Sequence, residues 1–283
     1  MDEQNTDILE RIRASYYQLT AAERRVADFV LLQYAQVQFM SITQLAEECG
    51  VAEATVSRFC RSMKLKGFNA FKIELARRSA PASPPQHKSV SMDTLAGRVQ
   101  ESGRMLVEAV HQTMDLMDLK LVTRAVELIE EAPTVMCIGS GGSMLMAQEC
   151  AHQFSTVSSK FTAVYDSHMQ ISAVATMDPK GVILLFSYSG ATTGGLQILE
   201  LARQRGIRTI LVTRFQKSPA AKLSTVVLRC GSDESPFQLG SVQAKVAQLV
   251  VIDALFQEYC LRNQEICEQN IQAIASALSV MHI

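Results

Sequence analysis

The 283-residue sequence contains no tryptophan and few aromatic residues, and its 27 basic and 28 acidic side chains leave a formal net charge of only −1. It also has no apolar run close to the roughly 18 residues that a membrane-spanning helix needs. Its first residues, MDEQNTDILE, are acidic where a signal peptide would be basic. We therefore expect neither membrane insertion nor secretion.

Cysteine pairs of the C-x-x-C type are absent, and the number of cysteines, seven, is odd. This usage argues against a disulfide framework and against a zinc site. His152 has no acidic residue or cysteine at metal-ligand spacing, so no metal ion is expected. The sequence thus predicts a protein of the reducing cytoplasm without a metal or other cofactor.

Proline is scarce, and three of the seven prolines fall in the stretch SAPASPPQHKSVS, residues 79–91, together with four serines. A segment with so little apolar content cannot pack, so we expect an extended linker there. The length of the chain also favours two domains. We predict a first domain at residues 1–78, a linker at 79–92 and a second domain at 93–283.

The periodic segments of the first domain are typical of helices. Thr20 and Glu23 form a capping box ahead of an apolar face that we assign to Val26, Phe29, Val30 and either Leu32 or a residue near it. Ser41 and Gln44 repeat the capping pattern before a second helix, which is expected to end at Gly50. The first domain is therefore predicted to be all-α.

Residues 41–63 have the spacing of a helix-turn-helix. Ala46 allows two helices to approach closely, Gly50 makes the turn, and Val51 and Val56 hold the second helix against the first. On that second helix we expect an inward stripe of Val56, Phe59 or Cys60, and Met63. The outward set is then Glu53, Ala54, Thr55, Ser57, Arg58 and Arg61.

Basic residues are concentrated in the same region, because residues 55–80 carry seven lysines and arginines against Glu74 alone. A basic stripe in a near-neutral protein indicates an anionic partner. We predict operator DNA as that partner, with Arg58 as the main base-contacting residue. The full predicted DNA-binding set is Thr55, Ser57, Arg58, Arg61, Lys64, Lys66 and Lys72, in which the lysines meet phosphates together with Arg77 and Arg78. The alternatives are a solvated helix face and a structural helical hairpin.

The second domain alternates short apolar runs with helical segments. The runs TVMCIG, FTAVYD, GVILLFS, RTILVT and TVVLRC are predicted strands, and helices are expected at about 93–116 and 118–131, between the later strands, and at the end of the chain. This alternation is typical of βαβ units. The predicted fold is thus an all-α helix-turn-helix domain followed by an α/β domain with a parallel five-stranded sheet flanked by helices.

Glycines and hydroxyl-bearing residues follow two of these strands. The first group is Ser140, Gly141 and Ser143, and the second is Ser187, Ser189, Gly190 and Thr192. Neither loop has a lysine or the G-x-G-x-x-G spacing, which excludes a P-loop and a dinucleotide fingerprint. Backbone amides and hydroxyls at helix starts suit a phosphate bound reversibly, and both loops should converge at the carboxyl edge of the sheet. The alternative is two ordinary capped turns.

Four segments taken together resemble the RpiR family of bacterial transcriptional regulators. They are SITQLAEECGVAEATVSRFCRSMKLKGFNAFK, IGSGGS, SYSGATT and SVQAKVAQLVVIDALF. The resemblance implies a helix-turn-helix ahead of a sugar isomerase (SIS) domain that senses a sugar phosphate. It matches Ser187, Ser189 and Thr192 to the phosphate loop and Ser143 to the first glycine turn. The sequence departs from the family at Ala52 (often serine), Lys64 (often glycine) and Lys245 (often arginine).

An isomerase would need a base, and the sequence offers Glu234 and His168 for that role. Either residue could instead bind a sugar hydroxyl, and Glu234 is included among the predicted effector-binding residues. Our main hypothesis is a non-enzymatic regulator that binds operator DNA as a homodimer or homotetramer and responds to a sugar phosphate. The alternatives are a phosphosugar isomerase with an accessory helical domain and a sugar-phosphate-dependent adaptor that binds another protein.

Overall fold

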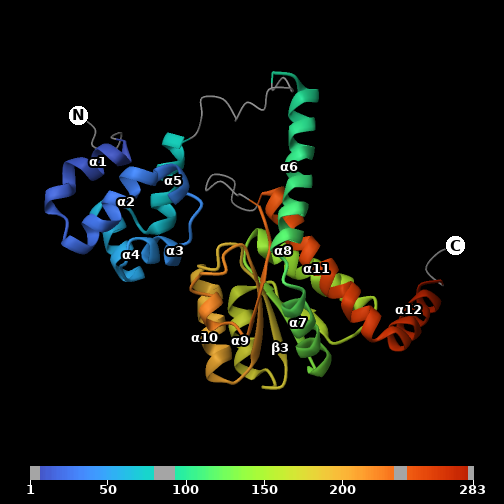
Figure 1. Ribbon diagram of the computed structural model, residues 1–283. Helices are drawn as coiled ribbons and strands as arrows, with labels where there is room; N and C mark the ends of the chain where they lie inside the picture. Colours follow the sequence, from blue (N-terminus) through green and yellow to red (C-terminus); the bar gives the residue numbers. More distant parts are fainter. Residues whose placement is uncertain (1–6, 80–92, 233–240, 280–283) are drawn as a thin grey trace. The chain divides into compact units, whose positions relative to one another are not determined.

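The computed structural model in Figure 1 describes residues 7–79, 93–232 and 241–279. The chain divides into two compact units, and the division falls within helix α6 (Leu95–Leu116), after Gly103. The two units have separate hydrophobic cores. The linker that we predict at 79–92 lies almost entirely outside the described residues, so its boundaries stay a prediction.

The first unit is helical, as predicted. Its α-helices before residue 80 are α1 (Ile8–Ser15), α2 (Ala21–Val37), α3 (Ile42–Glu48), α4 (Glu53–Ser62) and α5 (Phe68–Ser79). Both capping boxes are present, at Thr20 before α2 and at Ser41 before α3. The assignment of Leu32 to the inner face of α2 is wrong, because its side chain is 82% exposed. Six residues after Val26 is not a helical repeat, so Leu32 lies away from the buried Val26 and Val30.

The second unit is an α/β fold around one parallel sheet. Its elements in chain order are the part of α6 from Arg104 onward, α7 (Leu119–Glu131), β1 (Val135–Gly139), α8 (Gly142–Ser155), β2 (Phe161–Ala163), α9 (Ser167–Thr176), β3 (Val182–Phe186), α10 (Thr193–Gln204), β4 (Arg208–Thr213), the short 3-10 helix Ala221–Leu223, β5 (Val226–Arg229), α11 (Val242–Arg262) and α12 (Gln264–Leu278). The described strands pair in parallel in the order β2-β1-β3-β4-β5. The predicted five-stranded parallel sheet is confirmed.

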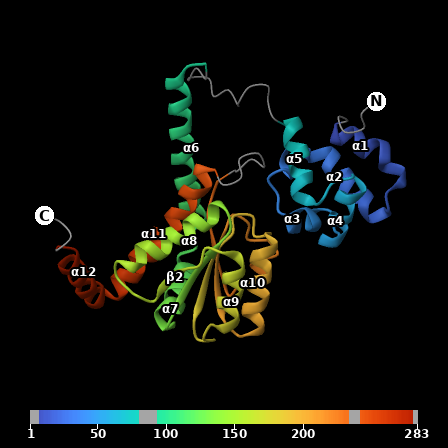
Figure 2. The ribbon, with the colours of Figure 1, turned by 180° about the vertical axis from the view of Figure 1, so that it is seen from behind.

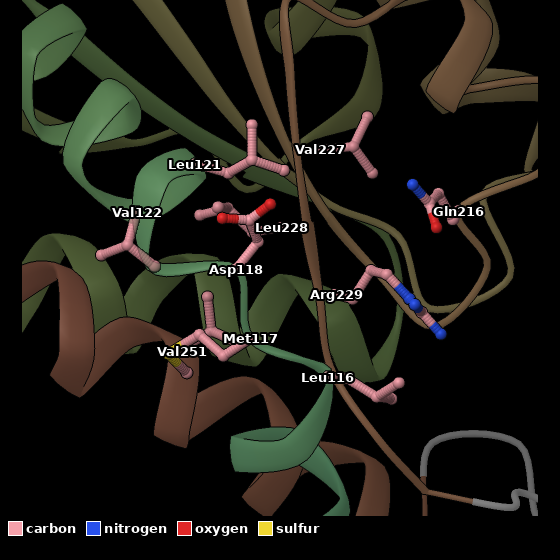
Figure 3. A pocket seen from close by; sticks show the side chains of 10 residues that line it. All are labelled: Leu116, Met117, Asp118, Leu121, Val122, Gln216, Val227, Leu228, Arg229 and Val251. Carbon is pink, nitrogen blue, oxygen red and sulfur yellow. The ribbon is translucent and has the colours of Figure 1, made fainter.

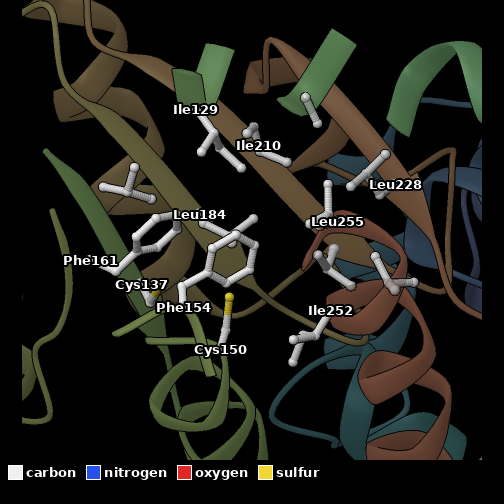
Figure 4. Packing of buried hydrophobic residues seen from close by; sticks show 14 of the residues in the cluster. Ile129, Cys137, Cys150, Phe154, Phe161, Leu184, Ile210, Leu228, Ile252 and Leu255 are labelled. Atoms are coloured by element: carbon white, nitrogen blue, oxygen red, sulfur yellow. The ribbon is translucent and has the colours of Figure 1, made fainter. Parts of the chain in front are cut away.

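Helices cover both faces of this sheet. Helices α7, α8 and α11 share one apolar core with it, and α9 and α10 share the other. Figures 1 and 2 show α8 beside α11 and α9 beside α10. Figure 4 shows the first core, where Phe154 stacks on Phe161 with ring centroids 4.2 Å apart. Every residue of β3 is buried, which explains why its sequence is a continuous apolar run.

The strand order also determines where a ligand can bind. Strand β2 lies on one side of β1, and β3, the next strand along the chain, lies on the other side. The sheet therefore has a topological switch point between β1 and β3. Gly139 at the end of β1 is in register with Phe186 at the end of β3. The loops that follow these two strands therefore begin side by side, as expected from the sequence.

The described residues also show the state of the cysteines and whether any helix could cross a membrane. The seven cysteines, all of which lie within the described ranges, are free thiols, and six of them are buried. None of the described helices combines the length and hydropathy that crossing a membrane requires.

Candidate nucleic-acid interface and effector site

Helices α3 and α4 form the predicted helix-turn-helix. Gly50 adopts a positive φ of 60°, and the N–H of Val51 donates to the carbonyl of Ala46 at 2.8 Å, which closes the end of α3. Ala46 is 3% exposed where the two helices meet. The hydroxyl of Thr43 on α3 donates to the carboxylate of Glu53 at 2.7 Å and fixes the start of α4.

Helix α4 has one buried and one exposed side. Val56, Phe59, Cys60 and Met63 are fully buried, as predicted, while Arg58 and Arg61 are exposed and Ser57 is partly exposed. The outward assignment of Thr55 is wrong, because Thr55 is only 5% exposed. It lies four residues before Phe59 and therefore shares the buried face. Its hydroxyl accepts a hydrogen bond from Arg58 at 3.2 Å, so Thr55 supports the arginine rather than facing outward.

Both ends of α4 carry a residue that departs from the family pattern, Ala52 at the start and Lys64 after the end. Ala52 is the N-cap and makes no side-chain cap. At the other end Lys64 adopts a left-handed φ of 56°, with its N–H bonded to the carbonyl of Arg61. The N–H of Leu65 donates to the carbonyl of Cys60 at 3.0 Å, which completes a Schellman motif. Arg11 of α1 donates to the carbonyl of Met63 at 2.9 Å and reinforces this end.

Glu23 joins α2 to α4. It is 8% exposed, accepts hydrogen bonds from Thr20 in the capping box, and accepts another from the Ser62 hydroxyl at 3.0 Å. Burial by itself would raise the pKa of Glu23, but these hydrogen bonds and the charge of Arg58 outweigh it and hold the pKa below its ordinary value. The position of the predicted recognition helix thus depends on a buried carboxylate.

The predicted phosphate-contacting lysines are in different surroundings. Lys64 and Lys66 are exposed. Lys72 is partly buried, and its ammonium group donates to the carbonyl of Met40 at 3.2 Å and lies 5.8 Å from the centre of the Phe68 ring. Lys72 therefore also stabilises its own domain.

In the second unit, the loop after β3 is held tightly. Ser187 is 4% exposed, its N–H donates to the carbonyl of Val212 at 3.0 Å, and its hydroxyl lies 3.4 Å from that of Thr192. Gly190 has a positive φ of 59°, and a Cβ atom there would lie 2.2 Å from the hydroxyl oxygen of Ser218. Glycine is thus required at 190 on two grounds, conformation and space.

The helices that follow the two loops begin without side-chain caps. The N-caps are Gly141 for α8 and Thr192 for α10, and neither makes a side-chain hydrogen bond to its helix. The neighbouring helices α7, α9 and α11 are capped by Asp118, Asp166 and Ser241. A helix start without a side-chain cap, at the positive end of the helix dipole, has the features of an anion-binding site. In α8 the N–H groups of Ser143 and Met144 donate to the carbonyls of Ser140 and Gly141 at 3.2 and 3.0 Å, so this first turn is partly satisfied by the backbone. Ser140 and Gly141 are exposed beside the first helix start, and Ser143 is partly exposed.

Gln170, which is not among the residues predicted from the sequence, positions the first glycine turn. It is 2% exposed, and its amide donates to the carbonyls of Gly139 at 3.0 Å and Val164 at 2.8 Å. A single glutamine within a helix has no spacing or partner that marks it in a sequence. His168 is exposed in the first turn of α9, and the other predicted base, Glu234, lies outside the described residues.

A pocket of about 180 Å³ lies elsewhere in this unit, where the α6–α7 connection meets the edge strand β5. Figure 3 shows Leu121, Leu228 and Asp118 near its middle, with Arg229 and Gln216 to one side. Burial and the nearby charge of Arg214 lower the pKa of Arg229. The lining contains none of the predicted effector-binding residues that the structure describes. Among the residues that the structure describes, no group of three or more histidine, cysteine, aspartate or glutamate side chains is placed to hold a metal ion.

Comparison with known proteins finds one family model in each part of the chain. Residues 6–82 match the family model described as "Helix-turn-helix domain, rpiR family", and residues 128–257 match the SIS domain model. An uncharacterised HTH-type transcriptional regulator of Caldanaerobacter subterraneus subsp. tengcongensis is 30% identical over 89% of this chain and 89% of its own length. The HTH-type transcriptional regulator HexR of Escherichia coli K12 is 28% identical over 96% of this chain and 94% of its own.

A solved structure is similar along nearly the whole chain. It is the Vibrio vulnificus NanR protein complexed with ManNAc-6P, with a TM-score of 0.87, 26% identity, and coverage of 98% of this chain and 100% of that one. Along this chain the helix-turn-helix match precedes the SIS match. The chain belongs to the RpiR family of helix-turn-helix transcriptional regulators with a SIS domain.

Proposed function

We propose that this regulator binds a phosphorylated sugar between the starts of α8 and α10 and alters its hold on operator DNA in response. The observation that carries the effector site is the pair of uncapped helix starts at the β1–β3 switch point, with Ser187 and Thr192 hydroxyls beside them. The ManNAc-6P bound to the related NanR protein supports a phosphosugar as the ligand class. Phosphate oxygens would accept from the hydroxyls and from those N–H groups at the two helix starts that are not already bonded to a backbone carbonyl.

For DNA we propose that α4 enters the major groove. Arg58, Arg61 and Ser57 lie on its outer side, where they reach base edges, and exposed Lys64 and Lys66 meet phosphates. We propose a homodimer or homotetramer with half-sites related by two-fold symmetry. The domain limits 1–78, 79–92 and 93–283 and a cytoplasmic location belong to the same proposal, as does Glu234 as a further ligand residue.

The effector can act only by binding two arrangements of the protein with different affinity. Footprinting would first locate the operator near the regulator's own gene. Operator affinity would then be measured with and without a panel of sugar phosphates that includes ManNAc-6P and glucose 6-phosphate. We expect at least one member of the panel to change the affinity fivefold or more.

The loop assignment is tested by the double variant Ser187→Ala/Ser189→Ala. We expect it to bind the operator as the wild type does, and to need at least tenfold more sugar phosphate for the same response, because two hydroxyl donors are lost. Ser155→Ala/Ser172→Ala, which removes two exposed hydroxyls on α8 and α9, is the matched control and should respond normally. An unchanged response of the Ser187/Ser189 variant contradicts the loop assignment.

The DNA interface is tested by Arg58→Ala. We expect weaker operator binding and poorer discrimination between operator and unrelated DNA, because a base contact is removed. Operator binding that is unchanged in this variant contradicts the assignment of Arg58 and favours the adaptor. Turnover of any sugar phosphate by the purified wild type would instead favour the isomerase.

A further inference from the structure

Tyr188 lies between the predicted ligand residues Ser187 and Ser189, and its side chain reaches a different part of the second unit. Its hydroxyl donates to the carbonyl of Ser232 and lies 3.1 Å from the Ser232 hydroxyl. The tyrosine ring contacts Phe215 edge to face, with centroids 6.3 Å apart. The loop after β3, residues 187–192, carries the predicted ligand residues and is called the effector loop below. Through Tyr188 it is joined to the segment that follows β5.

The backbone of Tyr188 is held as well. Its carbonyl accepts from the N–H of Arg214 and from the hydroxyl of Thr213, each at 3.0 Å. The Nε of Arg214 in turn donates to the same Ser232 carbonyl at 3.1 Å. Tyr188 therefore cannot shift with the loop without disturbing Ser232.

The same segment is fastened to α6 through Gly231. The N–H of Gly231 donates to the Thr113 hydroxyl at 3.0 Å, and that hydroxyl lies 2.7 Å from the carbonyl of Ala109 and 3.3 Å from that of Gly231. Thr113 is fully buried. A Cβ atom on Gly231 would lie 2.6 Å from the backbone of Gln112, so the segment and the helix are in direct contact.

We propose that Tyr188, Ser232, Gly231 and Thr113 form a link that carries the state of the effector loop to α6, an inference that rests on the proposed function. Helix α6 is the first described helix after the predicted linker, so it is the route along the chain to the DNA-binding domain. The link consists of partly buried hydrogen bonds at Tyr188 and Ser232, buried hydrogen bonds at Thr113 and Gly231, and the close contact of Gly231 with the backbone of Gln112. Packed contacts of this kind change between discrete arrangements instead of deforming gradually, which is what coupling between two sites requires. Tyr188 and Thr113 are positioning residues in this scheme.

The test compares effector response with effector binding. Thr113→Val keeps the shape of the side chain and removes the hydroxyl. We expect the variant to bind ManNAc-6P, or glucose 6-phosphate if that compound is active, with wild-type affinity by calorimetry. The ratio of operator affinities with and without that sugar phosphate should fall at least threefold. Thr113→Ser keeps the hydroxyl and removes only the methyl group, so it should keep the wild-type ratio. If packing of the methyl group were what matters, the serine variant would lose the response and the valine variant would not.

Tyr188→Phe gives an independent variant that keeps the ring and removes the bond to Ser232. If the two residues act through one link, the double variant Tyr188→Phe/Thr113→Val should lose no more of the response than either single variant. A full wild-type response in both single variants, or strictly additive losses in the double, overturns the link. A wild-type protein that binds no sugar phosphate overturns the proposed function, and the link falls with it.

Discussion

At the scale of single residues, Ala52 is a place where stability can be added. It is the N-cap of α4 and provides no side-chain acceptor to the first turn of the helix. Ala52→Ser should raise the free energy of unfolding of the DNA-binding domain by about 1 kcal/mol, because a serine hydroxyl at an N-cap satisfies one open N–H group. Urea unfolding monitored by circular dichroism measures the change.

Ala54 provides the matched control, since it is exposed two residues further along the same helix. Ala54→Ser introduces the same hydroxyl inside the helix, where serine is a poorer helix former than alanine, and should lower stability by a few tenths of a kcal/mol. Equal effects of the two substitutions would show that the N-cap of α4 has no special need of an acceptor.

A residue's role can be predicted from the sequence when it depends on local conformation, and cannot be predicted when it depends on contacts made only in the folded chain. Gly50 can be predicted because a turn needs a conformation that few residues adopt, and it has a positive φ. The outward assignment of Thr55 follows from its hydroxyl and its place near the start of α4, whereas its spacing of four residues from Phe59 puts it on the buried face. The role of Gln170 depends on carbonyls at residues 139 and 164, which only the folded chain brings together.

At the scale of elements, the capping box of α2 makes the stability of the first unit depend on pH. Glu23 has a pKa below its ordinary value, so its ionised form is stabilised by folding. That contribution is fully present above the pKa of an unfolded glutamate, about 4.3, and is lost as the pH falls through the lower folded value. Glu23→Gln should therefore destabilise the protein by about 1 kcal/mol at pH 7 and by less at pH 4.

Urea unfolding at the two pH values checks this expectation. Glu48→Gln, at an exposed glutamate at the end of α3, is the control and should change stability little at either pH. A Glu23→Gln variant whose deficit is as large at pH 4 as at pH 7 would mean that the charge of Glu23 is not what holds α2 to α4.

Strands and helices were largely predictable because their patterns are local. The run VILLF is buried along its whole length in β3, and RTILVT is β4 residue for residue. Strand β2 covers only Phe161–Ala163, shorter than the run FTAVYD, because the Asp166 side chain caps α9 and the chain has already left the sheet. The order of the strands depends on contacts between distant segments, so the local patterns predict a parallel sheet but not the order β2-β1-β3-β4-β5.

At the scale of the whole molecule, the uneven charge predicts how operator binding depends on salt. Each phosphate contact that is lost should make the slope of log affinity against log salt less steep by about 0.9. Lys66→Ala should therefore reduce the slope by about this amount for every chain bound, with little change in sequence preference. Equilibrium binding between about 50 and 200 mM salt measures it.

Lys180→Ala removes an equivalent exposed charge from the second unit and is the control. It should leave the slope unchanged, because the basic stripe of residues 55–80 belongs to the first unit. A slope that responds equally to both substitutions would indicate a general charge effect and not a phosphate contact at Lys66.

The uncapped starts of α8 and α10 have a consequence for the lifetime of the protein in the cell. No side chain caps either helix, and an anion bound at the helix starts would provide an acceptor that the side chains do not provide. Because such a ligand binds the folded chain only, it lowers the fraction that is open to proteases. The effector is then expected to set the amount of this regulator as well as its activity, with the empty form being degraded faster.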